Sequence, residues 1–258
     1  MVALATAAPK PAATNPEPVA KHSAAPAWLC GVLLFSHGQA ANAQLAHPGY
    51  TGLISTPTPE VLQQGHLSFG FSWLNGNNTY LFSPKTNRVF AVTIGILPGI
   101  EATLRQTQVV GWYPGDAPGV TYGFDRMFSA KYAVSLPNGL PKVAIGIQDL
   151  ASANYLLGRP GLKPGATQYG QTTAYGVLGD TYNSWAWHGG FGSSHAFIDG
   201  FFAGVSYQPI ERLSILSEWD SKYLNLGFRV LLLDDWWIQV SRIGLETWGI
   251  SSGLNISL

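Results

Sequence analysis

The sequence predicts an all-β fold: an antiparallel, up-and-down transmembrane β-barrel of about twelve strands in a single domain. Charged residues make up only 11% of the chain, against roughly 25% in ordinary soluble domains, which is too few to cover a water-exposed globule of this size. The chain also lacks the run of about 18 apolar residues that a membrane-spanning helix needs. Instead, segments of about ten residues alternate between apolar and polar side chains from residue 65 to the end, as strands with a lipid side and a lumen side do.

The first 64 residues are read separately from the barrel. Residues 1–43 are predicted to be a signal peptide or leader, because a short apolar core at 27–35 precedes the small residues Ala41, Asn42 and Ala43. Cleavage is therefore expected near Ala43, followed by secretion to the outer membrane of a Gram-negative cell. Residues 44–64 contain a Pro- and Gly-rich stretch that is unsuited to a spanning strand. They are expected to form either a periplasmic lead-in or a plug in the barrel mouth, and residues 65–258 the barrel.

The strands follow from alternation and from turn residues. The first, at 65–73, places Leu67, Phe69, Phe71 and Trp73 on one face. The sharpest hairpin joins 88–97 to 100–109 at Pro98-Gly99. Further strands are expected at 122–135, 142–148, 169–182, 184–192, 200–208, 212–220, 222–233, 236–244 and 248–258. Short turns at 209–211 and 234–235 alternate with longer loops at 112–121 and 150–168, as the two rims of an outer-membrane barrel predict.

Tryptophans are placed by their distance from the expected strand ends. Indole rings favour the membrane interface, and that is the expected position of Trp185, Trp187, Trp236, Trp237 and Trp248. Trp112 and Tyr113 lie in a long loop, which makes them candidates for stacking against a sugar ring.

Charged residues recur on the face opposite to the apolar one. The candidate site residues on this lumen-facing parity are Glu101, Arg105, Asp125, Lys131, Glu218, Asp220 and Arg229. A charge in a narrow lumen is tolerated only when it is solvated or paired, so acids and bases on neighbouring strands are expected to neutralise one another. Two interpretations remain open: structural ion pairs that fill a small barrel, or a nearly neutral polar surface along the path of a hydroxyl-rich polymer.

Several function classes are disfavoured. The 14 basic and 14 acidic residues give a net charge of zero, so no basic field exists to attract nucleic acid. The single cysteine, Cys30, forms neither an internal disulfide nor a metal cluster. The histidines lack metal-ligand spacing, and no nucleophile elbow, phosphate loop or dinucleotide motif is present. We therefore predict no cofactor, no metal site and no enzymatic activity.

Five segments in order along the chain resemble one known family. They are Gly49–Thr58 followed by Gly65, then Pro98–Glu101, then Asp125-Arg126 with Ser129 and Lys131, then Pro141–Asp149, and finally Ser217–Asp220 with Asn225–Gly227. Together they are similar to the YjbH-type outer-membrane proteins associated with exopolysaccharide production. The resemblance implies an outer-membrane barrel that acts in secretion or surface retention of a polysaccharide, without a cofactor or catalysis.

The predicted function is assistance in the export or surface anchoring of an extracellular polysaccharide. The expected partners are that polymer, outer-membrane lipid and other polysaccharide-secretion proteins. Two alternatives remain open: a general small-solute porin, which needs a wider water-filled bore, and a secreted carbohydrate-binding β-sandwich, whose outward strand faces must be polar.

Overall fold

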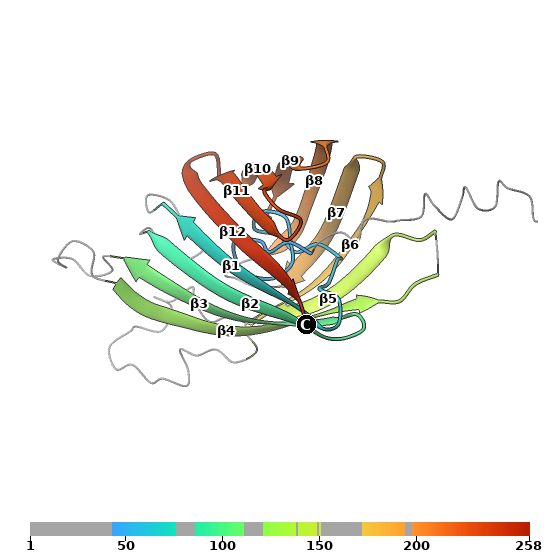
Figure 1. Cartoon of the computed structure of the whole chain (residues 1–258), viewed down its shortest axis with the longest axis horizontal. Coiled ribbons are helices and arrows are strands. Elements are labelled where there is room, and N and C mark those ends of the chain that lie inside the picture. Colours follow the sequence, from blue (N-terminus) through green and yellow to red (C-terminus); the bar gives the residue numbers. More distant parts are fainter. Residues whose placement is uncertain are drawn as a thin grey trace, which may run out of the picture. The chain divides into compact units, whose positions relative to one another are not determined.

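Twelve antiparallel strands close into one barrel within the part of the chain that the computed structural model describes (Figure 1). That part comprises residues 43–75, 86–110, 121–137, 139–148, 150, 172–193 and 198–258, without the side chains of 109–110 and 121–126. The strands are β1 (His66–Leu74), β2 (Asn87–Leu97), β3 (Ile100–Val110), β4 (Thr121–Val134), β5 (Lys142–Gln148), β6 (Thr173–Tyr182), β7 (Trp185–Ser193), β8 (Gly200–Ile210), β9 (Leu213–Trp219), β10 (Leu224–Leu231), β11 (Trp236–Ile243) and β12 (Thr247–Ser257). The predicted twelve-stranded antiparallel barrel is confirmed.

Each strand pairs with the next along the chain, and the last pairs with the first. The closing register runs from His66 opposite Ser257 to Leu74 opposite Gly249. Closure gives β1 and β12 a partner on both sides, so the sheet has no free edge. The sandwich fold of the secreted alternative is therefore wrong, because within the described residues a single sheet closes on itself.

Two predicted boundaries need correction. Pro209 and Ile210 belong to β8, so the turn predicted at 209–211 is wrong and the chain reverses at Glu211-Arg212 instead. The pairing of β8 with β9 shifts register between Tyr207 and Ile210. Proline is tolerated in a strand at such an irregularity, because its missing N–H interrupts no regular ladder bond. The strand predicted from residue 169 begins at Thr173 in the described part of the chain.

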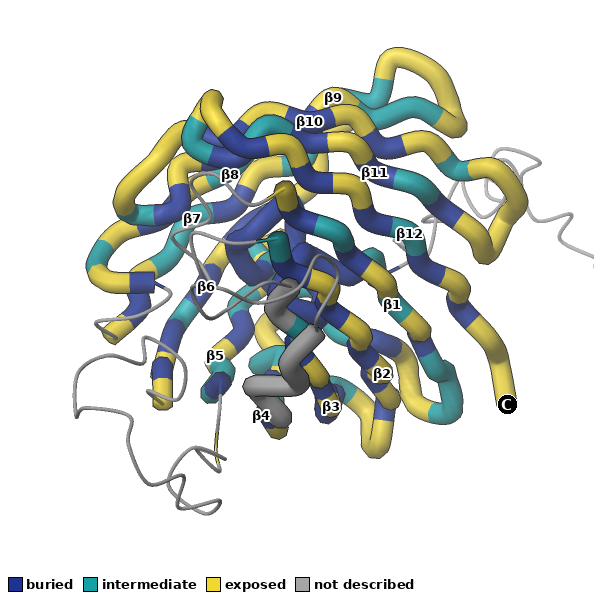
Figure 2. The backbone as a smooth tube through the Cα atoms, turned by 90° about the vertical axis from the view of Figure 1, so that its left-hand side faces the viewer, coloured by how far each residue is buried: buried dark blue, intermediate teal, exposed yellow. Residues whose placement is uncertain are grey.

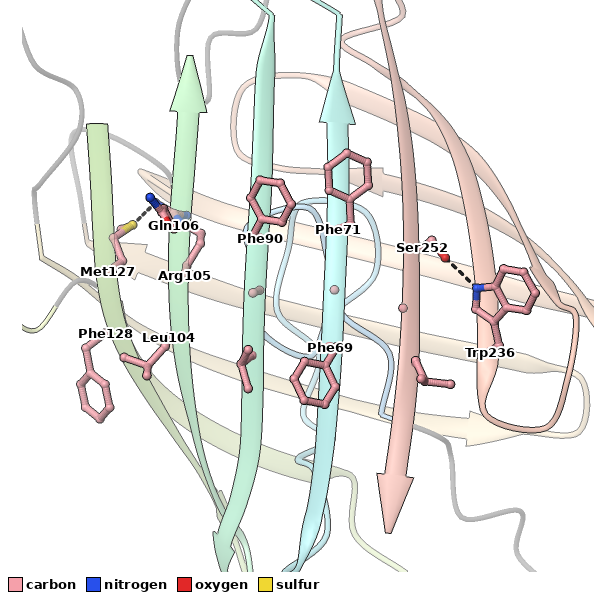
Figure 3. A pocket seen from close by; sticks show the side chains of 15 residues that line it. Phe69, Phe71, Phe90, Leu104, Arg105, Gln106, Met127, Phe128, Trp236 and Ser252 are labelled. Atoms are coloured by element: carbon pink, nitrogen blue, oxygen red, sulfur yellow. Dashed lines mark hydrogen bonds between the residues drawn. The ribbon is translucent and has the colours of Figure 1, made fainter. Parts of the chain in front are cut away.

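The outward face of the barrel is apolar. Burial alternates residue by residue along β2 and β12, which Figure 2 shows as alternating dark and yellow bands. Leu104 is 62% exposed and Phe69 is 42% exposed. The rings of Phe71 and Phe90 lie 5.2 Å apart on this face, where Figure 3 shows them beside Phe69 at an apolar hollow of about 720 Å³. A water-exposed protein does not present so large a continuous apolar surface.

The connections differ between the two ends of the barrel. At the end where β1 begins and β12 finishes, the β2–β3, β6–β7 and β8–β9 connections are the two-residue turns 98–99, 183–184 and 211–212. At the other end, β3–β4 and β5–β6 are joined by residues 111–120 and 149–172. Among the described residues, no helix has the length and apolar character needed to cross a membrane.

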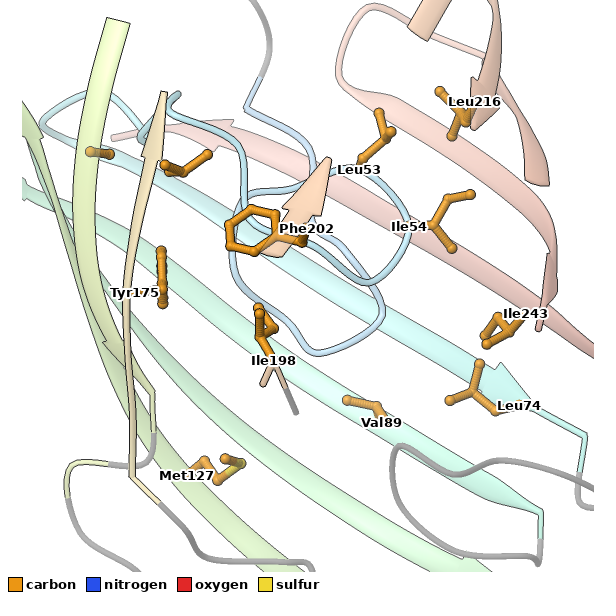
Figure 4. Packing of buried hydrophobic residues seen from close by; sticks show 12 residues of the cluster. Leu53, Ile54, Leu74, Val89, Met127, Tyr175, Ile198, Phe202, Leu216 and Ile243 are labelled. Carbon is orange, nitrogen blue, oxygen red and sulfur yellow. The ribbon is translucent and has the colours of Figure 1, made fainter. Parts of the chain in front are cut away.

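The apolar core lies inside the barrel. Leu53 and Ile54, from the segment before β1, pack with Phe202, Leu216 and other wall residues (Figure 4). This packing explains why β8 and β9 carry large apolar residues on their inner faces. The residues that precede β1 are therefore part of the folded interior.

Trp237 corrects one sequence prediction. It was expected at the membrane interface together with Trp236, but successive strand residues point to opposite faces, so the two indoles cannot share one side. Trp236 is exposed on the outer face, whereas Trp237 is buried in the lumen. There the Arg229 guanidinium lies 5.2 Å from its ring centroid. Gly253 leaves the space that the indole fills, since a Cβ at that position would lie 2.5 Å from Trp237 Cζ2.

Candidate functional site

Residues 43–64 are here called the plug, because residues 45–57 of this segment are buried inside the barrel. The segment is held in a compact shape by its own backbone: the Ala46 N–H donates to the Tyr50 carbonyl at 2.8 Å, and the Gly52 N–H donates to the Gln44 carbonyl at 2.8 Å. The Tyr50 hydroxyl donates to the Ser55 carbonyl at 2.5 Å. These bonds satisfy buried backbone groups that have no strand partner.

Wall glycines make room for the plug. A Cβ at Gly70 would lie 2.8 Å from Leu45 Cδ1, and one at Gly249 would lie 2.8 Å from the ring of His47. Because both positions face the lumen, any larger residue there would occupy space that the plug now fills. Nothing in the sequence distinguishes these two positions among the 30 glycines of the chain, so this contact could not be predicted.

The first polar contact between plug and wall, the Thr51 latch, joins Thr51 to β3 and β4. Thr51 Oγ1 donates to Glu101 Oε1 at 2.7 Å, and Lys131 Nζ donates to the Thr51 carbonyl at 2.9 Å and also to Thr51 Oγ1. Lys131 Nζ lies 3.2 Å from Glu101 Oε1. The Leu62 N–H occupies the other carboxylate oxygen at 2.8 Å. Both charged side chains are almost fully buried, so each neutralises the other where solvent cannot.

The second contact, the Thr56 latch, joins residues 54–56 to Glu218 of β9. The carboxylate accepts the N–H of Ile54 at 2.9 Å, the N–H of Ser55 at 2.6 Å and the hydroxyl of Thr56 at 2.8 Å. Thr56 Oγ1 also lies 2.8 Å from His188 Nε2 of β7. One wall carboxylate therefore satisfies several plug donors at once, and charge-assisted bonds of this kind are the strong ones.

Two arginines hold plug carbonyl groups. Arg229 of β10 donates from Nη2 to the Leu53 carbonyl at 2.5 Å and to the Gly52 carbonyl at 3.3 Å. Arg105 of β3 donates from Nη1 to the Pro48 carbonyl at 3.3 Å. Cationic groups from opposite parts of the wall thus donate to backbone carbonyl oxygens that have no N–H of a strand partner to accept.

Asp220 has a different role from the other acids. It follows the last residue of β9, where its Oδ1 accepts the Tyr223 N–H at 2.9 Å and its Oδ2 accepts Asn225 Nδ2 at 2.7 Å. Asn225 Nδ2 also donates to Glu218 Oε1 at 2.9 Å. Asp220 therefore shapes the β9–β10 connection and, through Asn225, orients the Glu218 carboxylate.

The structure buries six of the predicted site residues in the lumen: Glu101, Arg105, Lys131, Glu218, Asp220 and Arg229. Asp125 pairs with Thr107 through its backbone, and its side chain lies outside the described residues. Trp112 and Tyr113 also lie outside them. The residues that the sequence analysis missed are Thr51, Thr56, His188 and Asn225. The positions of all four can be read from the sequence, since the two threonines lie in the first family-like segment and His188 and Asn225 at lumen-facing strand positions. Nothing in the sequence pattern, however, indicates which residue each of them contacts.

His47 of the plug belongs to no strand and lies between two wall hydroxyls. Its Nε2 lies 2.6 Å from Ser241 Oγ and its Nδ1 lies 2.7 Å from Ser251 Oγ. Burial, and to a smaller extent the nearby Arg229 charge, together lower the pKa of His47 from 6.5 to about 3. The folded protein therefore holds this imidazole neutral.

Acid is expected to destabilise the folded state through His47. Below pH 6.5 the histidine of the unfolded chain binds a proton, whereas folded His47 stays neutral down to about pH 3. The contribution of His47 to the free energy of unfolding is therefore fully present above pH 6.5 and is lost as the pH falls toward 3. The expected contribution is about 1.4 kcal/mol per pH unit across that window. Urea unfolding in detergent at about pH 7.5 and about pH 4.5 measures it. His47→Gln, which can still bond both hydroxyls, should lose less stability on acidification, and an equal loss in both proteins would contradict the assignment.

Comparison with known proteins supports the family resemblance. The YjbH family model, described as exopolysaccharide biosynthesis protein YbjH, matches residues 44–158. No curated protein matches the chain significantly. Among solved structures, the chain is similar to a KdgM porin at 9% identity and a TM-score of 0.46, covering 74% of this chain and 99% of the porin.

Two further solved structures show weaker similarity. A KdgM porin in complex with disordered oligogalacturonate has 8% identity and a TM-score of 0.43, over 74% of this chain and 99% of the porin. The N-terminal β-barrel domain of Pseudomonas aeruginosa OprF has 9% identity and a TM-score of 0.26, over 76% of this chain and 100% of that domain. The family match includes the plug and the Thr51 latch, whereas Glu218 and Arg229 lie beyond it. The resemblance to the YjbH family that the sequence indicated is thus confirmed over residues 44–158.

Proposed function

We propose that this protein is an outer-membrane β-barrel that assists the export or surface anchoring of an extracellular polysaccharide and catalyses no reaction itself. The observation that carries the proposal is a closed wall that is apolar outside and polar inside, in a chain whose plug and first five strands match an exopolysaccharide family. An apolar exterior suits lipid, and a closed barrel leaves no backbone group unpaired within it.

The plug favours this role over that of a general small-solute porin. A general porin needs an aqueous bore through the barrel. Here the plug contacts β3, β4, β7, β9 and β10 through the two latches and the arginines. The space between Leu45, His47 and Trp237 admits no water-sized sphere. A barrel filled in this way is better suited to a polymer that is admitted under control than to passive diffusion.

Several features of the proposal extend beyond the family match. We infer cleavage near Ala43, which would make the plug the first segment of the mature protein. The outward apolar band would contact outer-membrane lipid, and the polymer and other secretion proteins would be the partners. Balanced charge in the lumen suits a weakly charged, hydroxyl-rich polymer.

Deleting the gene in its native host is expected to reduce extracellular or cell-attached polysaccharide, and the wild-type chain supplied in trans should restore it. The purified protein should show heat-dependent gel mobility in detergent, and in liposomes it should admit small sugars poorly. Unchanged polysaccharide after deletion would refute the polymer role. Rapid uptake of small sugars would favour the porin instead.

A further inference from the structure

We propose that the wall groups of the two latches form a binding site for an uncharged, hydroxyl-rich glycan segment, and that the plug occupies this site until the polymer displaces it. The inference rests on the proposed function and names the substrate class and the regulation of the same lumen. The site comprises Glu101 and Lys131 on one side of the lumen, and His188 and Glu218 on the other.

The chemistry of the two threonines carries the proposal. Thr51 Oγ1 donates to the Glu101 carboxylate and lies against the Lys131 ammonium, while Thr56 Oγ1 donates to the Glu218 carboxylate and lies 2.8 Å from His188 Nε2. A hydroxyl both donates and accepts, so each one fits between a carboxylate that accepts its proton and a nitrogen that donates an N–H to its oxygen. Sugar hydroxyls are alcohols with the same capacity. The plug therefore presents to the wall what a glycan would present.

The charge of the site selects an uncharged polymer. On one side, Glu101 of β3 lies 3.2 Å from Lys131 of β4. On the other side, Glu218 accepts hydrogen bonds from plug residues 54–56, and Arg229 donates to carbonyl groups of plug residues 52–53. Once the plug leaves, Glu101 and Lys131 remain on one side, and Glu218, Asp220 and Arg229 remain on the other, so each side presents at least one carboxylate and one cation. A polyanion would leave the carboxylates opposed by like charge, whereas a neutral hydroxylated chain bonds to both kinds of group.

The plug is attached in a way that permits displacement. Its residues are held by side-chain and loop hydrogen bonds, and the described bridge from it to a wall strand is Gln64 with Gly95. The strand ladder of the barrel would stay intact without it. Gly65 joins plug and β1 with a φ of +78° and no atom within 4 Å of its Cβ position. A glycine in that conformation, without side-chain contacts, can act as a hinge once its N–H releases the Gly95 carbonyl.

A reversible cross-link tests whether the plug must move. A Cβ at Gly70 would lie 3.6 Å from Leu45 Cβ, within the usual Cβ separation of a disulfide, roughly 3.5–4.5 Å. The full chain carrying Leu45→Cys and Gly70→Cys, with Cys30→Ser to remove the native thiol, is reconstituted into planar bilayers. Dextran, a neutral glucan, is the probe. Under oxidising conditions dextran binding should be lost, and reductant should restore it. Equal binding before and after reduction overturns the proposal.

Competition predicts opposite effects for plug and wall variants. The double variant Thr51→Val, Thr56→Val weakens the binding of the plug, which competes with dextran, and leaves the wall groups unchanged. The affinity for dextran should therefore rise about tenfold, which is about 1.4 kcal/mol. Glu218→Gln alters the wall and should bind dextran no better than the wild type despite its loosened plug. Thr181→Val, on the exposed rim of β6, is the matched control and should be unchanged. Unaltered affinity in the threonine pair overturns the proposal.

The outcome separates this inference from the proposed function. If dextran binding follows the plug variants while gene deletion leaves cellular polysaccharide unchanged, the lumen site stands and the export role falls. If deletion reduces polysaccharide but the locked protein still secretes it, the export role stands and displacement of the plug falls.

Discussion

Replacing Glu218 by Leu is expected to remove most of the stability of the plugged barrel. The N–H groups of Ile54 and Ser55 and the hydroxyl of Thr56 would lose their acceptor inside a lumen where water does not replace it. Each buried donor left unsatisfied costs roughly 1–3 kcal/mol, so we expect a loss of about 3–5 kcal/mol in the free energy of unfolding. Urea titration in detergent, followed by heat-dependent gel mobility, measures that loss.

Two companion variants show whether the loss comes from the latch. Glu218→Gln keeps one acceptor oxygen and should lose less than half as much stability as the Leu variant. Ile215→Val, on the outward face of the same strand, should change stability by less than about 1.5 kcal/mol. If the Leu variant unfolds at the wild-type urea concentration, the plug is not held by Glu218.

Gly95→Ala is expected to prevent the plug from joining the wall. The added Cβ would lie 1.9 Å from the Gln63 carbonyl oxygen and 2.7 Å from that of Leu62, both backbone atoms that no rotamer change can move aside. The Gly65 N–H also donates to the Gly95 carbonyl at 3.0 Å, so the clash lies where plug and sheet meet. Overpacking of this kind costs about 1–3 kcal/mol or more. The expected result is a lower urea midpoint together with faster proteolysis of the plug.

Gly176→Ala is the matched control for Gly95→Ala. It makes the same chemical change in a strand of the same barrel, and a Cβ there meets no atom within 4 Å. We expect its stability to stay within about 0.5 kcal/mol of the wild type. If both alanines behave alike, the close approach at Gly95 is not a constraint on the fold.

Local patterns were enough to predict the wall of the barrel. The alternation of Phe90, Val92 and Ile94 with small or polar residues identified β2, and their exposure confirms the outward face. A side-chain period of two is a property of the extended backbone, so it survives in the sequence without knowledge of the partner strand. Parity likewise placed Glu101 and Lys131 inside, although their separation by 30 positions says nothing about pairing.

The partners of the lumen residues could not be derived in the same way. Glu101 and Lys131 are opposite each other because β3 and β4 pair in that register, and Thr51 meets both because the plug folds back through the lumen. Contacts between residues 164 positions apart, such as Ile54 with Glu218, leave no periodic trace. Trp237 was misplaced because nearness to a strand end was weighed above its parity.

The amino-acid sequence by itself determined the strands, their outward apolar side and the resemblance to the YjbH family, because these depend on periodicity and short motifs within one segment. Only the tertiary structure decided that the lumen is filled, which glycines leave room for the plug, and which carboxylate binds which threonine. Those contacts depend on the register in which the strands pair and on the path of the plug through the closed barrel, which bring distant segments together in three dimensions, and no local pattern records either.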